Sequence, residues 1–100
     1  MLKISIVERR NQRRLVLEGK LVAPWAQELT PAYKEASADL NGRELVIDVK
    51  GLTAISEDGE IALLELTKEG VSFRHPGVFT KHILKRLVRE VRRNVQQEKR

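Results

Sequence analysis

Alternating hydrophobic and polar residues open the chain and predict two β-strands. Leu2, Ile4 and Ile6 alternate with polar neighbours, and this period of two places one face of a strand on a core. The polar stretch 9–14 follows and suits a hairpin connection, after which the alternation resumes over 15–19. The two strands are therefore expected to pair as an antiparallel hairpin.

A helix is expected next, from Pro24 to about residue 40, because apolar residues recur there every three or four positions. Pro31 interrupts this spacing, since a proline inside a helix removes a hydrogen bond and clashes with the preceding turn. The helix therefore either kinks at Pro31 or restarts there, with Thr30 as its N-cap. Asn41 and Gly42 mark its end.

Strand-like and helix-like segments alternate in the middle of the chain. Residues 45–49 form a short, almost wholly apolar run, which is typical of a central strand buried on both faces. Ser56 then precedes an apolar-rich helix that stops by Gly70, and residues 71–74 have the length and pattern of one more strand. A parallel arrangement is expected, because a helix connects each of these strands to the one before it.

The C-terminal part predicts a strongly amphipathic helix over 79–95, in which Lys and Arg occupy the positions between the apolar residues. Residues 96–100 are expected to fray. Taken together, the elements predict a single α/β domain, residues 1–100. Its mixed β-sheet would have about four strands, an antiparallel hairpin followed by parallel crossovers, with three to four helices.

Two segments of the chain resemble the STAS domain of bacterial anti-sigma-factor antagonists. One is the strand-like segment 15–21 with its Gly19, and the other runs from Leu45 through Asp48 to the loop that closes at Gly59. Asp48 matches an Asp that is common at this place in the family. The resemblance covers most of the chain and implies a STAS-like fold.

The loop before the second helix is the most informative part of this resemblance. In the family it reads Asp-Ser-x-Gly, and a partner that is both kinase and anti-sigma factor phosphorylates the Ser, which breaks the complex. Here Ser56 stands in place of the Asp, Glu57 replaces the phosphoacceptor and Gly59 matches. The segment 59–70 is also several residues shorter than the family helix. The resemblance thus implies a regulatory, protein-binding module that lacks the usual phosphorylation switch.

The chemistry of this loop can also be argued without the family. A helix N-terminus carries about half a unit of positive charge, which favours a nearby anion. Glu57 would supply about one negative charge where a phosphoserine carries roughly −1.5 to −2. Glu57 is therefore either a permanent, partial phosphomimetic or an ordinary acidic residue of a first turn capped by Ser56. The predicted partner-binding loop is Ser56, Glu57, Asp58, Gly59 and Glu60, and the expected protein partner is an anti-sigma factor or a serine kinase.

Composition narrows the available chemistry. The 100 residues are 41% hydrophobic and 33% charged, and they contain neither an apolar run of membrane-spanning length nor a secretory signal, so we expect a cytoplasmic protein. The resemblance implies a bacterial one. Cys is absent, and two histidines, His75 and His82, are too few to indicate a metal site without further ligands. No metal and no cofactor are therefore expected. The common nucleotide-binding, hydrolase and metalloprotease motifs are also missing, which predicts that the protein is not an enzyme.

The net charge of +5 is concentrated at the C-terminal end, because residues 81–100 carry +6 and the first eighty residues carry −1. This distribution supports an alternative function, electrostatic binding of nucleic acid or an anionic membrane, through Lys85, Arg86, Arg89, Arg92 and Arg93. A merely solvated helix face is the other interpretation. The four aromatic residues of the chain offer few platforms for base stacking.

Trp25, next to Pro24, is a candidate interface residue. The resemblance places the start of the first helix near the acidic loop, and aromatic side chains are common in interface hot spots. Packing in the core is the competing role for a large aromatic side chain. Homodimerisation through an exposed strand edge or through the last helix is a further option.

Overall fold

The computed structural model describes residues 1–98, with side chains described as far as Arg93. One sheet has the strand order β1-β2-β3-β4, made of β1 (Leu2–Glu8), β2 (Gln12–Leu21), β3 (Glu44–Ile55) and β4 (Ser72–Arg74). β1 pairs antiparallel with β2, whereas the β2–β3 and β3–β4 pairs are parallel. The predicted α/β fold with a four-stranded mixed sheet is confirmed.

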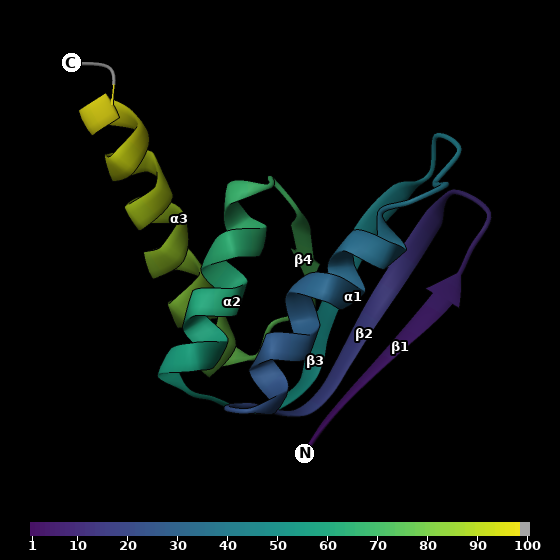
Figure 1. Ribbon diagram of the computed structural model, residues 1–100, viewed down its shortest axis with the longest axis horizontal. Coiled ribbons are helices and arrows are strands. Elements are labelled where there is room, and N and C mark those ends of the chain that lie inside the picture. Colours follow the sequence, from purple (N-terminus) through teal and green to yellow (C-terminus); the bar gives the residue numbers. More distant parts are fainter. Residues whose placement is uncertain (99–100) are drawn as a thin grey trace.

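Two helices, α1 (Leu29–Ala36) and α2 (Glu57–Lys68), lie against one face of the sheet (Figure 1). The 3-10 helix η1 (Trp25–Glu28) leads into α1, and α3 (Val78–Glu98) packs against α2. Three α-helices agree with the predicted number. The expectation of a frayed end at 96–100 is not met over 96–98, because α3 continues to Glu98, and residues 99–100 lie outside the described part of the chain.

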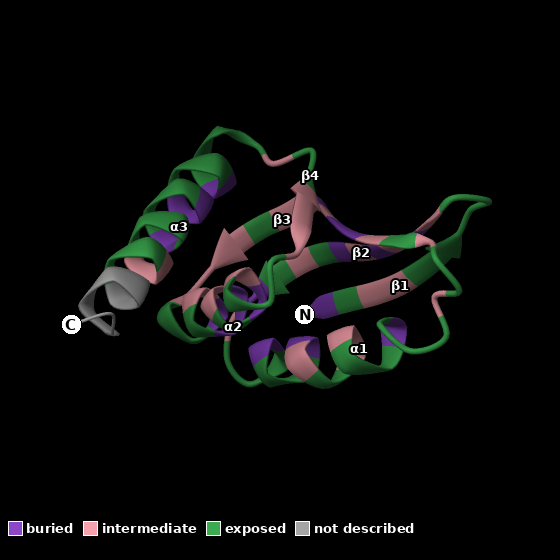
Figure 2. Ribbon diagram, turned by 90° about the horizontal axis from the view of Figure 1, so that it is seen from above, coloured by how far each residue is buried: buried purple, intermediate pink, exposed green. Residues whose placement is uncertain are grey.

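The core lies between the sheet and the helices (Figure 2). In β2, Leu15, Leu17 and Leu21 are fully buried, while Glu18 and Lys20 point away from the core and are exposed. The other strands and the helices contribute further buried members of this cluster, among them Leu29, Ile47, Val49, Leu63, Leu66, Ile83, Leu84 and Leu87. The alternation therefore sets the face of β2 that the helices cover.

Two predicted strand boundaries are wrong. The hairpin turn is confined to residues 9–11, so Arg13 and Arg14 belong to β2 instead of the connection. β3 continues to Ile55, well past residue 49, because two register shifts in its pairing with β2 let the two strands stay together as far as Leu21.

The prediction for the first helix is also wrong in detail. The helix α1 begins at Leu29 after Glu28, so Thr30 is not its N-cap. Pro31 is the third residue of the helix, where the missing N–H would lack a partner within the helix anyway, and it therefore needs no kink. α1 ends at Ala36, short of residue 40.

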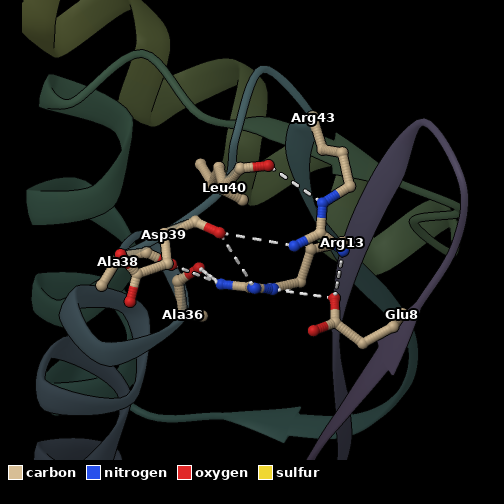
Figure 3. Close-up of polar contacts among 7 residues, drawn as sticks. All are labelled: Glu8, Arg13, Ala36, Ala38, Asp39, Leu40 and Arg43. Carbon is tan, nitrogen blue, oxygen red and sulfur yellow. Dashed lines mark hydrogen bonds and ion pairs between the residues drawn. The ribbon is translucent and has the colours of Figure 1, made fainter.

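A buried arginine ties the hairpin to the end of α1 (Figure 3). Arg13 donates to the carbonyl oxygens of Ala36 at 2.7 Å and Ala38 at 2.6 Å, and to Glu8 Oε1 at 2.8 Å. Arg43 donates to the same Glu8 oxygen at 2.9 Å. The Arg13 hydrogen bond, with the charges of both arginines, lowers the pKa of Glu8. Because the last carbonyls of a helix have no partner within it, Arg13 fixes the position of the α1 end.

Candidate functional site

Ser56 connects β3 to α2 and caps the helix, as predicted. Its Oγ accepts a hydrogen bond from the backbone N–H of Gly59 at 3.3 Å, and its carbonyl accepts one from Glu60 N at 2.9 Å. The backbone N–H of Ser56 donates to the Leu21 carbonyl at 3.1 Å. The first turn of α2 is thereby attached to the end of β2.

Gly59 allows this close attachment. It is buried, and a Cβ at this position would lie 3.1 Å from Ile55 Cγ2 and still nearer to the Leu21 carbonyl oxygen. Position 59 therefore has a steric reason to be a glycine in this chain.

The three acids of the turn have different surroundings. Glu57 and Asp58 are exposed, whereas Glu60 is half-buried and forms an ion pair with Arg86 of α3. The structure thus leaves Glu57 and Asp58 as the surface residues of the predicted loop, at a helix start where a carboxylate is electrostatically favoured. The other three loop residues take part in contacts within the protein.

A groove of about 320 Å³ lies beside these acids, between α2 on one side and η1 and α1 on the other. Asp58, Ile61 and Glu65 line it from α2, and Gln27 and Thr30 line it from the opposite side. The Ile61 residue is 53% exposed. The site predicted from the sequence omits Ile61. The run of four apolar residues at 61–64 could have indicated it, because four consecutive residues cannot all face the same side of a helix and one of them must be exposed.

Trp25 and Pro24 line a different groove, of about 690 Å³, together with Leu2 and Ile4 of β1. Trp25 is 37% exposed, so it lies at the surface and is not a core residue. Gln27 of η1 lines both this groove and the one beside α2. The predicted interface residues therefore adjoin the acidic loop through η1 without lining the same groove as Asp58.

The residues of the alternative function form the exposed side of α3. Five cations lie opposite its buried stripe, namely Lys85, Arg86, Arg89, Arg92 and Arg93. As far as side chains are described, Arg86 is the one among them that has a carboxylate partner. Arg86 and Arg89 also line a groove of about 380 Å³ with Phe79, His82 and Ile83.

The side chain of Asp48 forms contacts within the protein. Its carboxylate accepts a hydrogen bond from Lys50 N at 2.9 Å and lies 3.5 Å from Arg14 Nη1. Within the part of the chain that the structure describes, no group of three His, Asp or Glu residues is placed to hold a metal ion. No described helix has both the length and the apolar character needed to cross a membrane.

Comparison with protein-family models finds no match for this chain, and a search of curated proteins finds no relative.

Proposed function

We propose that this chain is a STAS-like, non-catalytic regulatory module that binds a protein partner at the start of α2. The observation that carries the proposal is the exposed Ile61, which lies in a groove between Asp58 and Glu65, one helical turn from Glu57. An apolar side chain in a groove with a polar rim is the usual arrangement of an interface centre.

The charge of this surface suggests the character of the partner. Asp58 and Glu65 line the groove, none of the Lys and Arg side chains that the structure describes does so, and Glu57 adds a further exposed carboxylate next to it. A complementary surface would present an apolar residue for Ile61 and basic residues around it. In the proposed function the partner is an anti-sigma factor or a serine kinase, and Glu57 supplies a constant charge in place of a reversible phosphate.

Quantitative affinity capture from the cells that make the protein tests this function. Wild type is compared with Ile61→Ser, Glu57→Ala and Glu57→Ser, and Glu69→Ala serves as the control because Glu69 is an exposed acid at the other end of α2. We expect one set of proteins to be lost with Ile61→Ser and weakened by both Glu57 variants, but retained by the control. Equal recovery of every protein by all five forms would refute the proposal.

A second candidate function follows from the exposed cations of α3. Binding of nucleic acid or an anionic membrane through Lys85, Arg89 and Arg92 would weaken steeply with salt, because each phosphate contact releases counterions. Titration of duplex DNA, single-stranded RNA and anionic vesicles at 20 and 200 mM salt, conditions chosen to span roughly the screening range of exposed charges, tests it. The absence of binding to all three at low salt would eliminate this function.

A further inference from the structure

The outer edge of β1 offers backbone groups for pairing. Lys20 N donates to the Met1 carbonyl at 3.0 Å and Arg9 N donates to the Gln12 carbonyl at 2.8 Å, and both pairs belong to the β1–β2 register. In an antiparallel pair, hydrogen-bonded residues alternate with residues whose N–H and C=O point the other way. The odd-numbered residues of β1 therefore bond to β2, while the even-numbered residues direct their backbone groups outward.

These outward groups belong to Leu2, Ile4, Ile6 and Glu8. β1 is an outer strand of the sheet (Figure 1). No hydrogen bond from the described residues reaches these groups. A regular seven-residue edge of this kind is a template for a further strand.

The side chains of Leu2 and Ile4 line the groove of about 690 Å³ between β1 and α1. Its apolar lining consists of Leu2, Ile4, Pro24, Trp25, Pro31 and Ala32. A strand added to β1 would place every second side chain on the α1 side of the sheet, next to this lining. The edge and the groove could thus recognise the backbone and the alternate side chains of one segment.

The negative charge of the groove indicates which kind of segment would bind there. Glu28 and Glu35 are exposed on the α1 side of the groove, and among the residues with described side chains no Lys or Arg lines it. A second copy of the chain would pair the two β1 strands about a two-fold axis and bring both pairs of acids together over the shared seam. A foreign segment with a basic side chain avoids this repulsion.

We infer that β1 accepts an extended segment of another protein as an added edge strand, with apolar residues and a Lys or Arg on the side that faces the groove. This surface is separate from the one at the start of α2 and does not depend on the proposed function. The backbone pairing supplies affinity, and Trp25, Glu28 and Glu35 supply side-chain preference.

Selection of peptides from a displayed library of random 12-residue sequences, followed by titration of the best synthetic peptide, tests the inference. Ile6→Pro removes one outward N–H that β2 does not use, and Ile6→Thr is its matched control because it keeps that N–H. Glu35→Lys inverts a charge at the groove, and Glu69→Lys inverts an exposed charge away from it.

We expect the selected peptides to alternate apolar residues with at least one Lys or Arg. Ile6→Pro and Glu35→Lys should each weaken binding about 10-fold, whereas both controls stay within about 3-fold of wild type, because a lost hydrogen bond or ion pair at a desolvated site has this size. Ile61→Ser should leave the peptide affinity unchanged, which separates this result from the test of the α2 surface.

Amide hydrogen exchange gives a measurement that needs no variant. The amides of Ile4 and Ile6 should exchange fast in the free protein and slowly with the peptide bound, while those of Lys3 and Ser5 are slow in both states. The inference is overturned if no peptide binds, if bound peptide leaves the Ile4 and Ile6 amides unprotected, or if Ile6→Pro instead abolishes a concentration-dependent dimer of the chain.

Discussion

Replacement of Gly59 by alanine tests how the candidate site is held in place. In an exposed helix this change would stabilise the protein by about 0.8–1 kcal/mol, because glycine is the poorer helix former. Here the new Cβ would overlap the Leu21 carbonyl oxygen and lie 3.1 Å from Ile55 Cγ2. Since the first contact is with backbone, α2 must move away from the end of β2.

That movement has a calculable cost. Overpacking costs about 1–3 kcal/mol, and the Leu21 carbonyl also accepts the Ser56 N–H at 3.1 Å, a bond whose loss costs about 1–3 kcal/mol if the amide stays unpaired. After the gain in helix propensity is subtracted, we expect Gly59→Ala to lower the free energy of unfolding by about 1–5 kcal/mol.

Urea unfolding followed by far-UV circular dichroism and by the fluorescence of the single Trp25 measures this difference. Gly77→Ala is the matched control, because a Cβ at Gly77 meets nothing within 4 Å and its backbone is not in the left-handed region. The control should lie between no change and about 1 kcal/mol of added stability. Equal stabilities of the two variants would refute the steric argument and, with it, the attachment of the α2 turn to β2.

Three further predictions concern stability. Ser56→Ala should cost about 1 kcal/mol in urea unfolding because it removes the N-cap acceptor, whereas Ser56→Asp should retain most of the stability. Leu63→Ala should cost about 2–5 kcal/mol because Leu63 is fully buried, and Ile61→Ala at its exposed neighbour should cost less than about 1 kcal/mol by the same measurement. The Arg13 hydrogen bond holds the pKa of Glu8 below its ordinary value of 4.5. The ionised Glu8 therefore stabilises the folded protein above pH 4.5, and this stabilisation is lost as the pH falls through the pKa of Glu8 in the folded state. Thermal melts should therefore show Glu8→Gln to be less stable than wild type at pH 7, with a gap that closes in acid, and an unchanged gap at pH 3 would contradict this.

Local physical rules explain which features could be predicted from the sequence. Leu15 and Leu17 face the core because alternation is a property of any strand, and Ser56 caps α2 because its hydroxyl reaches an N–H that has no partner within the turn that follows it. The order of the strands and helices and the exposure of Glu57 and Asp58 at a helix start follow from the same short-range rules.

Features that depend on distant segments needed the tertiary structure. Arg13 lies in a polar stretch that looks like a turn, and its role depends on carbonyls 23 and 25 positions further along the chain. Trp25 lies in a groove because Leu2 and Ile4, which line the groove with it, belong to β1 and are distant from it in the sequence.

The element types, the cap and the acidic turn were thus determined by the sequence alone, because each involves residues within about one helical turn or one strand repeat. Only the tertiary structure decided that Ile61 lies open beside η1 and that the even-numbered residues of β1 direct their backbone N–H and C=O groups to an unpaired edge of the sheet. Both depend on which segments meet when the strands pair and the helices pack on the sheet, and no short-range pattern encodes that choice.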